Sequence, residues 1–275
     1  MSERSGVRTP PDRPGTPAGE PLRLRLRRAA ARLVRTRTQL VRFSEPLVSF
    51  TFDDVLETAC TVGAPILEEA GARGTFYCAG HLHDGWTGPA LASPDQVVAL
   101  HRRGHEIGCH TYTHRAVSDL SREALAADLA RNRAHFSGLA PDMALSNFAY
   151  PFNTTSLRAK RQLERSFATC RAGVPGVNAG RIDLGYLRAV ELADGFADRA
   201  AIRAWIARAV RERGWLIFFS HGIAQVPEPW GCHPDLLRFA VAEAGTQGAR
   251  IVPVAEAVRR AAGGTTAEPE RAFLS

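Results

Sequence analysis

The sequence predicts an α/β fold in which about seven parallel strands form a closed or nearly closed, distorted barrel. Between residues 46 and 262, short segments rich in Val, Phe, Ile and Thr alternate with amphipathic segments of helical period. Such alternation favours parallel pairing with right-handed crossovers. The seven or eight strand–helix units indicate a barrel. An open doubly wound sheet is the alternative, which is weakened because no glycine-rich nucleotide-binding pattern follows any strand.

Composition divides the chain into three regions. Residues 1–45 contain 11 arginines and four acidic residues, so this region carries the whole net charge of +7 and the remainder is neutral. The proline-rich start cannot build a core, and we predict that residues 1–45 form a disordered basic tail. We assign residues 46–262 to the barrel domain and residues 263–275 to a C-terminal tail.

The arginine-rich segment 22–42 could contact an anionic membrane, because leucine and valine alternate there with arginine. A solvated arm is the alternative. We expect no nucleic-acid partner, since the rest of the chain is neutral. No apolar run has the length of a signal peptide or a membrane span. The expected location is therefore the cytoplasm, with peripheral contact to the inner membrane face as a further option.

The five cysteines are odd in number and form no C-x-x-C pair, so we expect buried free thiols rather than disulfides or a structural zinc site.

Each element of the barrel domain has a local signal. β-Branched and aromatic runs predict the strands, at residues 47–52, 74–78, 106–109, 147–150, 167–170, 186–192, 215–219 and 250–254. Apolar stripes and capping residues predict the helices, at residues 57–70, 94–103, 121–136, 156–165, 198–213, 234–244 and 255–262. Ser93 is a predicted N-cap with Pro94 at the first helical position, and Pro65 is expected to kink its helix.

Asp53 and Asp54 directly follow the first predicted strand. A buried carboxylate must be paired, protonated or metal-bound, and two adjacent carboxylates repel one another. One metal-bound and one free aspartate would satisfy both constraints. Solvated acids at the start of a turn are the alternative.

His110 and His114 directly follow the third predicted strand. Residues four apart share one face of a helical turn, so both imidazoles can point at one metal ion. Such a pair also arises by chance. Together with Asp54 from a neighbouring strand end, however, the two histidines would form an open site of two imidazoles and one carboxylate.

Two further strand ends carry reactive groups. His221 follows the strand at 215–219, and in α/β barrels reactive groups gather at the carboxyl ends of strands. A satisfied core histidine is the alternative. After the fourth strand, Pro151 can fix a turn that leaves the Phe152 N–H free to donate to an oxyanion.

Together these segments resemble the polysaccharide deacetylase family with the NodB-homology domain, also called carbohydrate esterase family four. The four matching motifs occur in the family's order, as Thr51-Phe52-Asp53-Asp54, His110-Thr-Tyr-Thr-His114, Phe148-Ala-Tyr-Pro-Phe152 and Phe219-Ser-His221. The resemblance implies a distorted (β/α) barrel of NodB-homology type. It also implies metal-dependent N-deacetylation of an amino sugar in a polysaccharide or a lipid-linked glycan.

The resemblance also implies a role for each motif residue. Asp53 resembles the catalytic base, His221 the catalytic acid and the Phe152 N–H the oxyanion donor. Asp54, His110 and His114 resemble the ligands of one divalent ion, with Zn²⁺ expected and other transition metals as alternatives.

Three departures from the family pattern lead to further expectations. Many members have arginine where Ala149 stands, and that arginine orients the base; we expect Arg188 to replace it. Glycine is common in the family at Val55 and Asn153. The acidic partner of the acid histidine has no clear counterpart, and the candidates are Asp183 and Asp194.

Four residues are expected to contact substrate: Tyr112, Tyr150, Pro151 and Trp230. Aromatic faces suit the apolar faces of sugar rings, although Tyr112 could simply pack and rim packing is the favoured interpretation for Trp86. Two other functions stay open. The same site could hydrolyse an O-acetyl ester or a non-sugar amide, or the barrel could bind glycan or membrane without catalysis.

Overall fold

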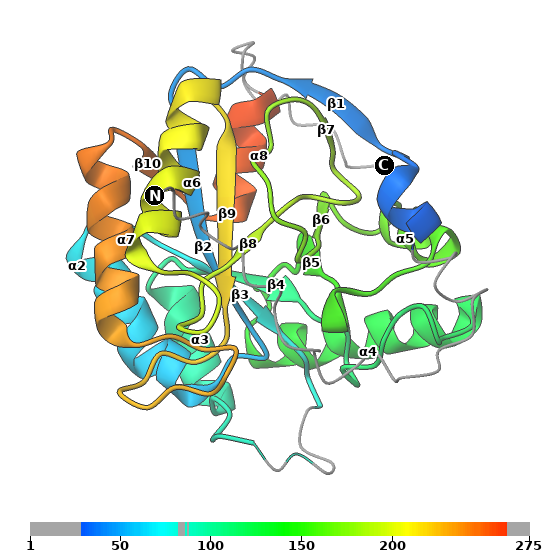
Figure 1. Cartoon of the computed structure of the whole chain (residues 1–275). Helices are drawn as coiled ribbons and strands as arrows, with labels where there is room; N and C mark the ends of the chain where they lie inside the picture. Colours follow the sequence, from blue (N-terminus) through cyan, green and yellow to red (C-terminus); the bar gives the residue numbers. More distant parts are fainter. Residues whose placement is uncertain (1–28, 82–85, 87, 263–275) are drawn as a thin grey trace.

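The computed structural model describes residues 29–81, 86 and 88–262, and its centre is a curled parallel sheet (Figure 1). The strand order is β6-β5-β4-β3-β2-β9-β8, with β10 paired to the start of β2, and every pair is parallel. The strands are β2 (Leu47–Asp53), β3 (Thr75–Cys78), β4 (Glu106–Cys109), β5 (Asn147–Ala149), β6 (Thr169–Arg171), β8 (Val190–Glu191), β9 (Trp215–Ser220) and β10 (Arg250–Ile251).

The two edges of this sheet approach one another. Arg171 of β6 forms a parallel bridge with Leu187, whose N–H donates to Cys170 O at 2.8 Å. The chain then continues into β8, which pairs with β9. Residues 187–191 therefore link the outermost strands. The prediction of about seven parallel strands in a distorted barrel is confirmed.

The helices surround the sheet, and one of them begins at the predicted N-cap Ser93. They are α2 (Ala64–Glu69), α3 (Pro94–Arg102), α4 (Arg122–Leu139), α5 (Leu157–Leu163), α6 (Arg199–Glu212), α7 (Pro234–Thr246) and α8 (Val254–Ala262). Ser93 accepts a hydrogen bond from the Gln96 N–H and forms a capping box with it. Next to Pro65, a π-helical turn at Ala59–Gly63 gives way to α2, which agrees with the expected irregularity. Within the described part of the chain, no helix has the length and apolar character that crossing a membrane requires.

The five cysteines are free and buried, as expected.

The prediction of a disordered tail is wrong for residues 29–45. Residues 29–33 are helical, and β1 (Thr38–Val41) pairs antiparallel with β7 (Gly180–Asp183), a strand that the sequence analysis missed. β7 was missed because its only partner among the described strands lies in the segment interpreted as a tail. The strand expected over 186–192 is correspondingly short and reduces to β8. Residues 1–28 and the C-terminal tail at 263–275 lie outside the described residues.

Packing explains why the basic segment is ordered. Val41 and Phe43 belong to a buried cluster that includes Phe219 of β9, while Leu40 is 57% exposed. The fully buried ammonium group of Lys160 donates to the carbonyl of Val34 at 2.7 Å and pairs with Asp183 at 2.6 Å. Val41 and Phe43 therefore pack onto the barrel, while Arg42 between them is exposed.

Replacing Phe43 by alanine should lower the free energy of unfolding by about 3–5 kcal/mol, because it removes a buried aromatic ring. The control is Leu40→Ala in the same segment, which should change stability by no more than about 0.5 kcal/mol. Urea unfolding of both variants measures the difference. Equal stability of the two variants would mean that residues 38–43 do not pack on the barrel.

Candidate active site

The candidate site lies at the carboxyl ends of the barrel strands. Asp53 is the last residue of β2, His110 directly follows β4, Arg171 ends β6 and His221 directly follows β9. In a parallel barrel these ends meet on one face, so residues far apart in the sequence gather there.

Asp54, His110 and His114 come together as the sequence analysis predicted. One ligand atom from each lies within 4.8 Å of the others. Asp54 Oδ1 lies 3.0 Å from His114 Nε2 and 3.5 Å from His110 Nε2. The Nδ1 of His110 is 2.9 Å from the carbonyl oxygen of Ala149. An Nδ1–H donated to that carbonyl leaves the lone pair on Nε2 facing the other two residues.

The electrostatics of this group suit a divalent cation. Burial lowers the pKa of His110 to about 4, so its imidazole is neutral at pH 7. Burial alone would raise the pKa of Asp54, but the contact with His114 and the charges of His221 and His110 hold it below its usual range. Apart from its contact with His114, Asp54 Oδ1 is buried without a hydrogen-bond partner among the described residues. One carboxylate and neutral imidazoles are the donor set of open transition-metal sites, so these residues fit such an ion.

The two histidines do not lie on the expected helical turn. Residues 110–114 form a bend in which Thr111 has φ +65° and His114 has φ +49°. Asp128 of α4 holds this bend by accepting hydrogen bonds from the N–H groups of Tyr112 (2.5 Å) and Thr113 (3.2 Å). Asp128 lies in the middle of α4, and no local feature of the sequence identified it beforehand.

Left-handed backbone is concentrated around the site. Seven non-glycine residues of the described chain have positive φ, and all but Arg213 lie in three site loops: Asp54, Val55, Thr111, His114, Phe152 and Asn153. Such conformations cost about 1–3 kcal/mol each and persist where surrounding contacts impose them. The conformation explains why glycine suits the positions of Val55 and Asn153. At Asp54, φ +62° breaks the strand, so its carboxylate points away from that of Asp53.

Asp53 is held by a buried arginine that the sequence analysis did not identify. Arg171 Nη2 lies 2.6 Å from Asp53 Oδ1 and 2.5 Å from Oδ2, and both residues are at most 3% exposed. The guanidinium lies 4.8 Å from the ring centre of Phe219 and 5.3 Å from that of Tyr77. The carboxylate orientation is thereby fixed by two adjacent bonds from one charged nitrogen.

The expectation that Arg188 orients Asp53 is wrong. Arg188 is exposed, and its Nη1 donates to the carbonyl of Pro175 at 3.1 Å. The parallel register instead places Arg171 of β6 directly beside Ala149 of β5. The arginine missing at Ala149 is thus supplied one strand further along the barrel. Its position at a strand's carboxyl end was the signal that could have identified it.

His221 faces the metal-ligand group. Its Nε2 lies 3.9 Å from Asp54 Oδ2, and its Nδ1 lies 3.2 Å from the carbonyl oxygen of Trp230. Neither acidic candidate contacts it: Asp183 pairs with Lys160, and Asp194 accepts a hydrogen bond from a backbone N–H. The expectation of Asp183 or Asp194 as its partner is therefore wrong, because a backbone carbonyl occupies that place.

The expected substrate residues divide into rim and interior positions. Trp230 is partly exposed, and its ring centre lies 6.2 Å from that of His221. The side chain of Phe152 is also at the rim: it is 50% exposed, and its ring centre lies 4.7 Å from that of His114. Tyr150 and Pro151 are buried, and the Tyr150 hydroxyl donates to Gly185 O. Substrate contact by these two residues stays a prediction.

Tyr112 is engaged in packing. The ring of His81 stacks on it at 5.5 Å, and the Arg131 guanidinium lies 4.3 Å from its ring centre. These contacts favour a packing role for Tyr112 over stacking against a sugar ring of the substrate. Trp86 is partly buried and donates to the carbonyl of Pro89, which agrees with rim packing.

Comparison with known proteins gave one family and several similar folds. Residues 41–167 match the family model described as Polysaccharide deacetylase. No match was found among curated proteins. Among solved structures, a family 4 acetyl xylan esterase from Clostridium thermocellum, in complex with a cobalt ion, is 20% identical with a TM-score of 0.56, over 79% of this chain and 92% of that chain.

Two other solved structures have a comparable fold. The chitin deacetylase from the fungus Colletotrichum lindemuthianum is 18% identical with a TM-score of 0.55, over 79% of this chain and 89% of that one. A CE4 family pseudoenzyme from Bacillus anthracis, BA3943, is 11% identical with a TM-score of 0.56. The match covers 82% of this chain and 70% of that chain. At these identities the likeness concerns the fold. Residues 41–167, which include Asp53, Asp54, His110 and His114, thus match the polysaccharide deacetylase family, and the resemblance that the motifs predicted is confirmed.

Proposed function

We propose that this protein is a divalent-metal-dependent hydrolase that removes acetyl groups from N-acetylated amino sugars of a polysaccharide or glycolipid. The observation that carries the proposal is the placement of the Asp54, His110 and His114 group beside His221, with Asp53 paired to Arg171 at the adjacent strand end. The family match and the chitin deacetylase of similar fold support the choice of an N-acetylated sugar.

One carboxylate oxygen of Asp54 and the Nε2 atoms of His110 and His114 would hold the ion. A bound divalent ion supplies Lewis acidity toward the acetyl carbonyl and makes water a stronger acid. Zn²⁺ is the first candidate because this ligand set suits it, and the cobalt ion in the similar esterase supports a divalent transition metal.

Asp53 acts as the general base, accepting a proton from the attacking water at a carboxylate oxygen. Arg171 binds both oxygens through one nitrogen, so each oxygen keeps a lone pair for that proton. The base therefore stays oriented before substrate arrives, which saves the entropy of ordering it during reaction.

His221 acts as the general acid, giving a proton from Nε2 to the departing amine. Its Nδ1–H donates to the Trp230 carbonyl, which holds the ring with Nε2 toward Asp54. The N–H of Phe152 donates to the oxygen on which charge develops, and its left-handed backbone at the mouth of the site directs that N–H.

A second candidate is an O-acetyl esterase, favoured by the acetyl xylan esterase of similar fold. An ester needs less assistance from an acid than an amide does, because an alkoxide is a better leaving group than an amide nitrogen. The non-sugar amidase stays an alternative on the same site. The pseudoenzyme of similar fold shows that the barrel alone does not imply catalysis. Here, however, two acids and three histidines are retained, which a binding role does not require.

Acetate release from N-acetylated glycans and lipid-linked sugars, beside matched O-acetylated glycans, tests the proposal. We expect release from N-acetylated substrates, loss of release after chelation, and recovery with Zn²⁺ or Co²⁺. Preferential release from O-acetylated substrates would instead identify an esterase. Stoichiometric metal binding without release from any of them would support the non-catalytic alternative.

Asp53→Asn and Asp54→Asn should have opposite effects in a metal titration. Asn at position 53 cannot accept a proton at neutral pH, so this variant should keep its metal and lose about 10²–10⁴-fold in kcat. Asn at position 54 should weaken metal affinity by more than the ~10–100-fold typical of residues that only orient ligands. Added metal should restore part of its activity. Metal loss in the first variant and retention in the second would reverse the two roles.

Arg171→Met should lower kcat by about 100-fold with little change in KM, because the base loses its orientation. Arg188→Met removes the same charge from an exposed position and should keep full activity. Thermal melting and metal content of both variants separate misfolding from misorientation, and Arg171→Lys should recover part of kcat. If only Arg188→Met lost activity, the assignment of Arg171 would be overturned.

A further inference from the structure

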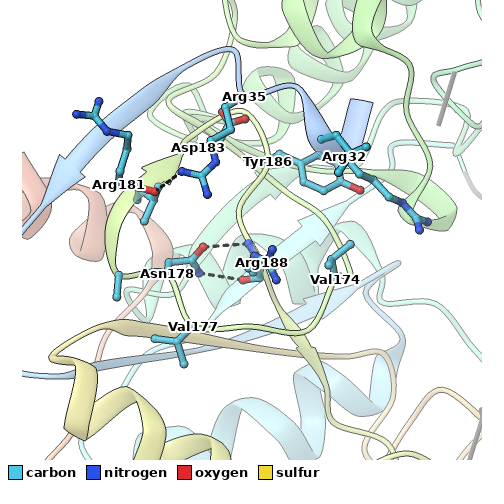
Figure 2. A pocket seen from close by; sticks show the side chains of 12 residues that line it. Arg32, Arg35, Val174, Val177, Asn178, Arg181, Asp183, Tyr186 and Arg188 are labelled. Atoms are coloured by element: carbon cyan, nitrogen blue, oxygen red, sulfur yellow. Dashed lines mark hydrogen bonds between the residues drawn. The ribbon is translucent and has the colours of Figure 1, made fainter. Parts of the chain in front are cut away.

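A second hollow, separate from the candidate active site, lies between the arginine-rich N-terminal segment and the region around β7 (Figure 2). Its volume is about 240 Å³. Four arginines line it: Arg32, Arg35, Arg181 and Arg188. In Figure 2, Arg32 and Arg181 extend outward from opposite sides, while Arg35 and Arg188 lie between them. The wall contains Val174, Val177 and Tyr186.

Within the described part of the chain, no carboxylate compensates the positive charge of the arginines at this hollow. All four arginines are exposed, and no ion pair between described residues joins any of them to a carboxylate. Asp183 is the only acidic residue in the lining, and it pairs with Lys160 at 2.6 Å. Arg35 and Arg188 instead donate to the carbonyls of Arg181 and Pro175. Four guanidinium groups around one hollow favour an anionic ligand with several acceptor oxygens, such as a phosphate.

Exposed apolar side chains accompany these arginines. Leu33 lines the hollow and is 80% exposed, and Leu40 is 57% exposed. Leu40 pairs directly with Arg181 across β1 and β7, so both side chains lie on the outer face of this small sheet. Exposed leucines next to arginines form an amphipathic surface of the kind that binds the interface of an anionic bilayer.

We propose that this surface, formed by the four arginines with Leu33 and Leu40, docks the protein on an anionic lipid membrane. The arginines hold lipid phosphates, one of them within the hollow, and the two leucines enter the headgroup boundary. The docking surface is built from the segment 29–41, from β7 and from Arg188, and it does not depend on the proposed catalytic function.

Sedimentation of the full chain with vesicles of equal parts phosphatidylcholine and phosphatidylglycerol tests the proposal, beside vesicles of phosphatidylcholine alone. We expect binding only to the anionic vesicles, weakening with salt as the screening length falls from ~10 Å at 0.1 M. Arg35→Gln with Arg181→Gln should lower the partition coefficient about 30-fold, since each arginine at an anionic surface contributes about 1 kcal/mol. The Arg→Lys double variant should retain most binding.

The charge-matched control is Arg102→Gln with Arg199→Gln, which removes two exposed arginines from α3 and α6. It should lower partitioning less than about 3-fold, and melting temperatures should show that both double variants are folded. Leu33→Ser with Leu40→Ser should weaken the binding that remains at high salt. Equal losses in the two arginine variants would overturn the proposal. So would calorimetric binding of inorganic phosphate, or binding of a single-stranded RNA, that needs Arg35 and Arg181 while vesicle binding does not.

Discussion

The buried ion pair between Asp53 and Arg171 is the interaction on which the arrangement of the site depends. Two charges enclosed in a barrel are costly unless each satisfies the other, and removing one partner typically costs about 3–5 kcal/mol. The register of β5 and β6 puts Arg171 beside Ala149, and the rings of Phe219 and Tyr77 lie close to its guanidinium. The closing of the barrel at Arg171 and Leu187 therefore serves the fold and the site together.

The pair also separates the two acids. Asp53 keeps the strand conformation and faces Arg171, while the left-handed backbone of Asp54 directs its carboxylate to the histidines. The two adjacent carboxylates therefore have different partners. The strain at Asp54 and at the bend before His114 is offset by contacts from elsewhere, of which Asp128 is the clearest.

The N-terminal segment 29–45 contains apolar residues that pack on the barrel and arginines that remain exposed. Val41 and Phe43 pack onto the barrel, β1 pairs with β7, and Lys160 donates hydrogen bonds to two carbonyls of the segment. Arg32 and Arg35 of the segment are exposed and line the hollow, and no ion pair among the described residues joins them to an acid. Residues 29–45, in which arginines alternate with apolar residues, therefore form part of the surface of the folded domain.

The sequence by itself determined the barrel, most of its strands and helices, and the identities of Asp53, Asp54, His110, His114 and His221. These features follow from local periodicity, capping residues and the rule that reactive groups lie at strand ends, all of which are readable along the chain. Only the tertiary structure decided that Arg171 rather than Arg188 meets Asp53, and that β1 belongs to the fold. Only it placed Tyr150 in the core and the Trp230 carbonyl beside His221. Each of these depends on which strands become neighbours and in which register, and a pairing between distant segments leaves no trace in the sequence of either one.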